Sequence, residues 1–148
     1  YSDDGGIHKI ASDGTGKTDL ADGKVDNFCY TLDDLYYCTD GKIKRISSVV
    51  SGVDVGLNFN EVMGSVFAFT TDTSGRGVLF YLDGAGTIHQ KNLESERERS
   101  EEDVALISAP DAADLFYAGG QLYYHARTGD FFAVTINGSD SSAARVEN

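Results

Sequence analysis

Short runs rich in apolar and aromatic residues alternate along most of this chain with clusters of Gly, Asp and Asn. The runs "DNFCYTL" (26–32), "SVFAFTT" (65–71) and "DLFYA" (114–118) are typical of strands, because β-branched and aromatic residues favour a pleated, half-buried surface. The clusters between them tolerate the positive φ angles of tight turns. The pattern therefore predicts an all-β protein of short strands joined by tight turns.

One stretch departs from this pattern. "NLESERERSEED" (92–103) has a helix-forming composition, but it is charged on every side and has no apolar stripe. It cannot pack as an ordinary amphipathic helix. We expect a solvated insertion between strands, with a turn or two of helix at most.

The strand pattern repeats four times. Each copy has an anchor tyrosine, then a glycine-containing turn, then an apolar residue six or seven positions after the anchor. The anchors are Tyr1, Tyr37, Tyr81 and Tyr124, and the apolar residues are Ile7, Ile43, Ile88 and Phe131. Each copy is expected to be a β-hairpin, preceded in three copies by another apolar strand and followed by a more polar one. The repeat units are approximately 1–24, 25–64, 65–112 and 113–148, within a single domain.

Units of about 40 residues with four short strands are typical of β-propeller blades. The count is about fifteen strands, because the first unit lacks its opening strand. We therefore expect a β-propeller of about four short blades, or part of a larger propeller completed by a partner chain or a second copy. A β-trefoil is the alternative, since its length of about 150 residues in three repeats also fits.

The stretch "LYYCTDGKIKRI" (35–46) resembles the YWTD-type β-propeller repeat, in which an aromatic pair and an Asp precede a turn and an I-x-R strand. The resemblance covers most of the chain, although no copy has the Trp. "GVLFYLDGAGTIHQ" (77–90) is also similar to blades of fungal fucose-binding lectins. The Arg, Glu and Trp with which those lectins bind sugar do not recur here, so the resemblance implies a fold and no binding residues.

The two cysteines flank the predicted hairpin "YTLDDLYY" (30–37). If Asp33 and Asp34 form a two-residue turn, Cys29 faces Cys38 at a non-hydrogen-bonded position, where Cα atoms approach to about 4.5 Å. That distance permits a disulfide, which would indicate an oxidising compartment. Two buried thiols are the alternative.

Net charge and targeting signals restrict the classes of partner and the location that we expect for this protein. With 24 acidic and 12 basic residues, the net charge of −12 disfavours nucleic acid and anionic membranes. No apolar run is long enough for membrane insertion, and the start of the chain does not resemble a signal peptide. The sequon Asn137-Gly138-Ser139 follows a predicted strand and adds to the expectation of a secreted or extracellular protein.

Catalytic and metal motifs are not apparent in the residue spacings. His8 and His89 occupy equivalent repeat positions that hold Lys44 and Phe132 in the other copies, and no zinc-binding spacing occurs. Asp3, Asp40 and Asp83 also recur, and we expect each to cap its own turn rather than to converge as a hydrolase would need. No cofactor is expected, although Asp-Gly clusters such as "SDGTG" leave calcium open.

These observations favour a non-catalytic extracellular binding module, most simply a lectin-like one that binds a glycan. A protein–protein interaction propeller is the first alternative, and a propeller hydrolase such as a lactonase or sialidase is the second. The candidate contacts are Tyr36, Phe80 and Tyr123, which alternate with the anchor tyrosines. The same residues could instead fill the opposite face of each sheet.

Overall fold

The computed structural model describes residues 1–31, 33–47, 49–50, 62–93, 103–137 and 140–147. These residues form fifteen β-strands and no helix, which confirms the all-β prediction and the expected number of strands. The predicted insertion begins within a strand that ends at Leu93, and the next strand begins at Asp103; residues 94–102 lie outside the described part.

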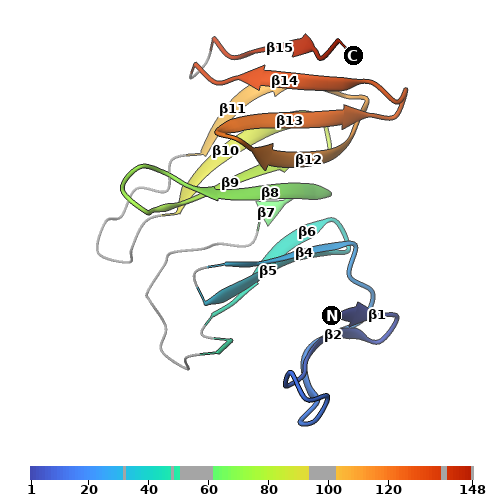
Figure 1. The fold of residues 1–148 in the computed structure, drawn as a ribbon. Helices are drawn as coiled ribbons and strands as arrows, with labels where there is room; N and C mark the ends of the chain where they lie inside the picture. The colour runs from blue at the N-terminus through green and yellow to red at the C-terminus, as the bar shows by residue number, and fades with distance from the viewer. Residues whose placement is uncertain (32, 48, 51–61, 94–102, 138–139, 148) are drawn as a thin grey trace.

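The strands form four separate antiparallel sheets, numbered here 1 to 4 in chain order (Figure 1). Sheet 1 contains β1 (Ser2–Asp3), β2 (Gly6–Lys9) and β3 (Thr18–Asp22). Sheet 2 contains β4 (Asn27–Thr31), β5 (Asp34–Thr39), β6 (Lys42–Ile46) and β7 (Val62–Met63). Sheet 3 contains β8 (Val66–Thr71), β9 (Gly77–Leu82), β10 (Thr87–Leu93) and β11 (Asp103–Ser108). Sheet 4 contains β12 (Ala112–Ala118), β13 (Gln121–Ala126), β14 (Phe131–Thr135) and β15 (Ser142–Arg145).

In every sheet the strands are hydrogen-bonded in chain order, and the four sheets match the four repeat units to within one residue. Among the residues that the structure describes, sheet 1 has three strands and no counterpart of β4, β8 and β12. The described strands do not join into the closed barrel that a trefoil requires, since no described strand pairs with a strand of another sheet.

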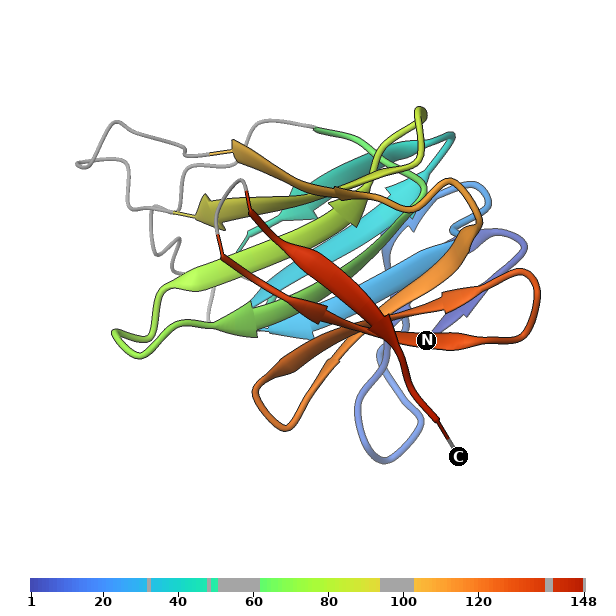
Figure 2. The ribbon, with the colours of Figure 1, turned by 90° about the horizontal axis from the view of Figure 1, so that it is seen from above.

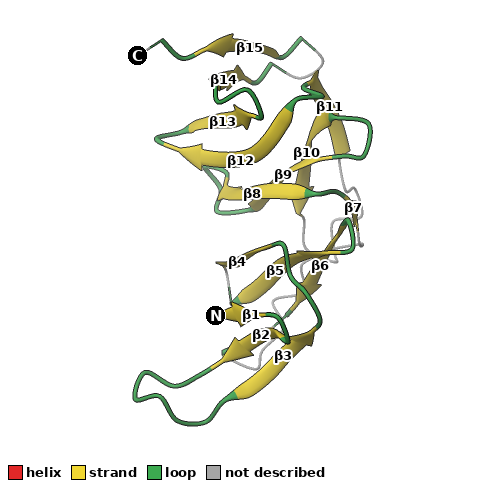
Figure 3. Cartoon of the chain, turned by 90° about the vertical axis from the view of Figure 1, so that its right-hand side faces the viewer, coloured by secondary structure: helices red, strands yellow, loops and turns green. Residues whose placement is uncertain are grey.

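The four sheets are stacked face to face in chain order, with the two ends of the chain at sheets 1 and 4 (Figure 1). Seen from above, the strands of sheet 4 cross those of the preceding sheets at an angle (Figure 2). The first strands β4, β8 and β12 lie on the same side of the stack (Figure 3), and β8 contacts both of the others. Among the described residues this stack does not close into a ring.

Two apolar layers join sheets 2, 3 and 4. The layer between sheets 2 and 3 includes Tyr36, Ile43 and Leu79, and the layer between sheets 3 and 4 includes Phe80 and Leu122. All five side chains are buried, so burial between sheets, rather than within any one sheet, removes most of the apolar surface from water.

The predicted disulfide is wrong, because both cysteines are free thiols. Thr31 pairs with Asp34 across the β4–β5 hairpin, so Cys29 lies opposite Tyr36 and Cys38 lies opposite Asn27. Because the hairpin turn lies one residue earlier than predicted, each residue of β4 pairs with the residue of β5 two positions before its predicted partner. The two cysteines are therefore diagonal neighbours and not a directly opposed pair. Cys38 instead directs its Sγ atom toward the carbonyl oxygens of Gly64 and Ser65, at 3.2 and 3.3 Å.

Asp34 explains the shifted register. Its side chain is buried within β5, where a carboxylate oxygen accepts a hydrogen bond of 2.7 Å from Nε of Arg45. Asp33 instead has a positive φ of 64° and belongs to the turn. The next predicted turn is confirmed, since Asp40 and Gly41 both have positive φ, at 51° and 69°.

Candidate functional site

The three predicted contact residues have different environments. Tyr36 stacks on Phe69 of sheet 3 with ring centroids 5.1 Å apart, and Phe80 stacks on Tyr117 of sheet 4 at 5.7 Å. Both Tyr36 and Phe80 are buried, so a ligand cannot reach their rings in this structure. Their repeat position is a packing position, covered each time by the next sheet in the stack.

Tyr123 is partly exposed, because no described sheet follows sheet 4. Its ring stacks within its own sheet on Phe116, at 5.2 Å. Phe131 contacts Phe116 edge-on at 6.0 Å and stacks on His125 at 4.6 Å. We call these four side chains, Phe116, Tyr123, His125 and Phe131, the aromatic face of sheet 4.

A pocket of about 390 Å³ adjoins this face at Phe131. The turn before β14 contributes Gly129 and Asp130, and the chain at the end of β15 contributes Arg145, Val146 and Glu147. Nη2 of Arg145 lies 2.5 Å from Oδ1 of Asp130, and the backbone N–H of Val146 donates to the carbonyl of Phe131 at 2.8 Å. This end pocket therefore combines an aromatic ring, two carboxylates and a guanidinium.

Two of the three recurring aspartates, Asp3 and Asp83, cap their own turns. Asp3 accepts a hydrogen bond from the N–H of Gly5 at 2.8 Å, and Asp83 accepts from Ala85 and Thr87 at 2.9 and 2.8 Å. Asp13 of "SDGTG" likewise accepts from the N–H and hydroxyl of Thr15. These carboxylates serve the turns in which they lie, as expected from short polar side chains next to glycine.

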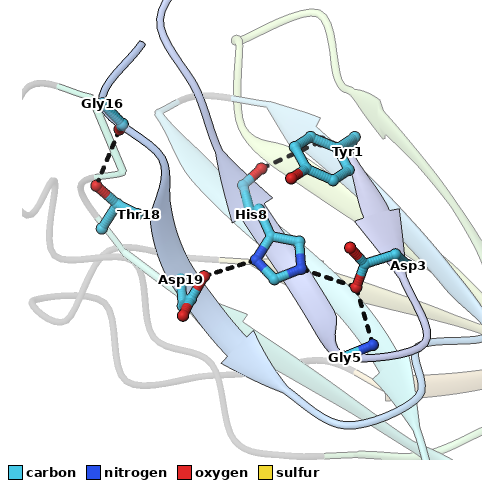
Figure 4. A network of polar contacts seen from close by, with 7 residues as sticks. All are labelled: Tyr1, Asp3, Gly5, His8, Gly16, Thr18 and Asp19. Carbon is cyan, nitrogen blue, oxygen red and sulfur yellow. Dashed lines mark hydrogen bonds and ion pairs between the residues drawn. The ribbon is translucent and has the colours of Figure 1, made fainter. Parts of the chain in front are cut away.

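His8 joins the three strands of sheet 1 through two carboxylates (Figure 4). Its Nε2 atom lies 2.9 Å from Oδ1 of Asp3, and its Nδ1 atom lies 2.7 Å from Oδ1 of Asp19. His89 has the same arrangement in sheet 3, with Asp83 at 3.1 Å and Asp103 at 3.2 Å. Each histidine also lies against its anchor tyrosine, His8 against Tyr1 at 5.0 Å.

The charges of the His8 network reinforce one another. Ionised carboxylates only accept hydrogen bonds, so both contacts are satisfied when both ring nitrogens carry a proton. Two hydrogen bonds raise the pKa of His8 above its usual value, that to Asp3 most strongly and that to Asp19 second, although desolvation opposes this increase. The same hydrogen bond from His8 lowers the pKa of Asp3, aided by the N–H of Gly5. The network joins the three strands of sheet 1, and we assign it a structural role.

Within the described part of the chain, no group of three or more His, Cys, Asp or Glu residues is arranged to hold a metal ion. No helix among those residues is long and apolar enough to cross a bilayer. Asn137 is exposed, and the N–H of Asp140 donates to its carbonyl at 3.0 Å, which places the residue in a turn. Gly138 and Ser139 of the sequon lie outside the described residues.

The sequence predicted Tyr123 as a contact residue, and it did not predict the end pocket. Asp130, Arg145 and Glu147 come from two segments 15 residues or more apart, and no local motif links them. The one available signal was Phe131, an aromatic residue at a repeat position where the three other copies have a buried isoleucine.

Comparisons with protein-family models, with curated proteins and with solved structures return no match for this chain.

Proposed function

We propose that this chain is an arc of a β-propeller that serves as a non-catalytic, extracellular binding module. Four stacked sheets support the propeller, because their strands run in chain order and the first strands of sheets 2, 3 and 4 lie on one side, as the inner strands of blades do. The resemblance to YWTD-type repeats leads to the same proposal. The free cysteines remove one argument for secretion, so the extracellular location depends on the exposed Asn137.

The proposed ligand is a carbohydrate bound in the end pocket of sheet 4. The observation that carries this proposal is the pairing of an exposed ring with charged hydrogen-bonding groups: Phe131 is 46% exposed beside Asp130, Arg145 and Glu147. Sugar hydroxyls donate to carboxylates and accept from a guanidinium, while the C–H face of a sugar ring packs on an aromatic side chain. A volume of about 390 Å³ is within the usual range for small-ligand sites.

A glycan array probed at physiological pH tests this proposal. The unmodified chain should give a specific saccharide signal, and Phe131→Ala should weaken the binding of that saccharide at least about tenfold. Tyr123→Ala tests whether the ligand extends over the aromatic face. Met63→Ala is the control, because it removes an exposed apolar side chain from sheet 2. Silence of the unmodified chain across the array would refute carbohydrate binding.

A protein partner is the second candidate, and the packing of the stack favours it. The positions equivalent to Tyr123 are covered by the next sheet in sheets 2 and 3. The aromatic face therefore has the composition of a surface on which another β-sheet packs, and aromatic residues are enriched at protein interfaces.

Photo-crosslinking distinguishes this candidate. A photoreactive phenylalanine analogue at position 123, but not at position 63, should form one defined protein adduct in cells that produce this protein. The adduct should disappear when Phe116→Asp places a charge in the aromatic face. Equal crosslinking at both positions would exclude a specific interface there.

A further inference from the structure

Sheet 1 has a β-bulge in its outermost strand, beside the histidine. Ile7 pairs with Ala21 and the next residue, His8, pairs with Asp19, so Leu20 is the extra residue of β3. A bulge re-aims the side chains beside it. Here it places Asp19 directly opposite His8, with Oδ1 2.7 Å from Nδ1 (Figure 4). A side-chain contact therefore ties the outermost strand to β2 in addition to the backbone hydrogen bonds.

Sheet 3 repeats this device. Its register also shifts at the histidine, between Ile88 and His89, which makes Leu106 the extra residue of β11. Asp103 lies two positions before the residue opposite His89, hence on the same face of β11, and its Oδ1 lies 3.2 Å from Nδ1 of the histidine. In sheet 4 this position holds Phe132, and β14 pairs with β15 one residue to one. The bulge thus accompanies the histidine in both sheets that have one at this position.

The other ring nitrogen of each histidine contacts a carboxylate at the end of the preceding strand. Nε2 of His8 lies 2.9 Å from Asp3, and Nε2 of His89 lies 3.1 Å from Asp83. Ionised carboxylates only accept hydrogen bonds, so a doubly protonated ring can donate to both of its partners. A neutral ring has one N–H, and its other nitrogen presents a lone pair to a carboxylate. Loss of a single proton therefore removes one of the two contacts.

Three charged groups from different segments act on His8. Asp3 and Asp19 contact the ring, and Lys17 lies on the far side of Tyr1, with Nζ 5.8 Å from the centroid of the tyrosine ring that packs on His8. The hydrogen bond to Asp3, followed by that to Asp19, raises the pKa of His8, while desolvation and the charge of Lys17 oppose the increase. The two carboxylates outweigh the single cation, which favours the charged ring.

His89 has a comparable environment between sheets 2 and 3. Tyr81 stacks on its ring at 4.9 Å and donates a hydrogen bond of 2.7 Å to Oδ2 of Asp103. Lys91 lies opposite Asp103 in the register of β10 and β11. Sheet 2 packs on the same face of sheet 3, and its described titratable side chains there are Asp34, Tyr36, Cys38 and Arg45. Each histidine thus combines two carboxylates with an aromatic ring.

We propose that this histidine is a proton-dependent clamp on the outermost strand of sheets 1 and 3, which releases that strand as pH rises. The imidazolium holds β3 or β11 to the two preceding strands. The neutral ring keeps one contact and repels the carboxylate at its other nitrogen. β3 and β11 are each hydrogen-bonded to one strand only, so local opening frees them first. The clamp is independent of the end pocket and of any ligand bound there.

Hydrogen exchange of backbone amides, followed by NMR between pH 5.5 and 9, tests the clamp. Rates are corrected for the intrinsic effect of pH on exchange. The protection of β3 and β11 amides that bond to the preceding strand should fall at least about tenfold over this range. The protection of β15, the outermost strand of sheet 4, should not change. Constant protection of β3 and β11, or an equal decrease in β15, would overturn the proposal.

Two variants separate the clamp from a general effect of charge. The amide of Asp19→Asn can accept from a protonated Nδ1 and donate to a deprotonated one, so the protection of β3 should no longer depend on pH. Asp13→Asn removes the same charge from the β2–β3 loop, where Asp13 bonds to Thr15, and should leave the pH dependence of β3 unchanged. Circular dichroism at pH 5.5 checks that both variants fold. Full pH dependence in Asp19→Asn, or its loss in Asp13→Asn, would refute the clamp.

Discussion

The exchange of Asp34 for asparagine tests the register of the β4–β5 hairpin. The structure has Asp34 in an ion pair with Arg45, at 2.7 Å, with the two side chains only 1% and 10% exposed. Asp34→Asn removes the negative charge and leaves a nearly buried guanidinium opposite a neutral amide. Asp33→Asn is the matched control one residue earlier, where asparagine also tolerates the positive φ of 64°.

The expected magnitudes differ widely. Removing one partner of a buried ion pair costs about 3–5 kcal/mol, and the amide oxygen of asparagine can still accept one hydrogen bond, so we expect about 3 kcal/mol for Asp34→Asn. In a domain of this size, each kcal/mol lowers Tm by roughly 2–4 °C, which gives a decrease of about 6–12 °C. Asp33→Asn retains an acceptor for the N–H of Val50 and should change the free energy of unfolding by about 0.5 kcal/mol or less.

Urea unfolding followed by far-ultraviolet circular dichroism gives both free energies, and thermal melts give the shifts in Tm. Replacing both Asp34 and Arg45 by leucine should recover most of the loss, because the buried charge is then removed together with its partner. A larger effect of Asp33→Asn than of Asp34→Asn would refute the reasoning. Such a result would indicate that both aspartates lie in the turn, a register in which Cys29 faces Cys38 and a disulfide is geometrically allowed.

Three further predictions concern other parts of the stack. Hydrogen bonds to the carboxylates raise the pKa of His8, so their contribution to stability is complete below about pH 6.5 and is lost as pH rises through the folded-state pKa. The Tm measured in thermal melts between pH 5.5 and 9 should therefore vary less with pH in His8→Asn than in the unmodified chain. Equal variation of Tm in the two proteins would contradict this prediction. Gly86→Ala should lower the free energy of unfolding by about 2 kcal/mol or more in urea titrations, because φ is +80° and a Cβ would lie 2.6 Å from a backbone atom. Gly84→Ala, which meets nothing within 4 Å, should cost about 0.5 kcal/mol or less, and similar costs at both positions would disprove the packing argument. Alkylation without reductant should label both Cys29 and Cys38 in denaturant. In the native protein Cys29 should be labelled faster than Cys38, because Cys38 is buried. If mass spectrometry finds either cysteine unlabelled in denaturant, the two form a disulfide.

Much of the fold follows from local patterns. Strand positions, the grouping of strands into four sheets and the Asp40-Gly41 turn depend on residues close together in the sequence, and all could be predicted from it. The Asp33-Asp34 turn could not, because both residues have the same turn propensity. The choice between them depends on Arg45, eleven residues beyond Asp34, which removes that aspartate from the turn and binds it in the sheet.

The candidate site shows the same division between sequence and tertiary structure. The sequence by itself determined that Tyr36, Phe80 and Tyr123 are equivalent, because the repeat places them at one position of each hairpin. Only the tertiary structure decided that the first two are buried and the third is partly exposed. Exposure at this position depends on whether another sheet follows in the stack, and contacts between sheets join residues far apart in the chain. The end pocket arises for the same reason, since it adjoins the face of sheet 4 on which no further described sheet packs.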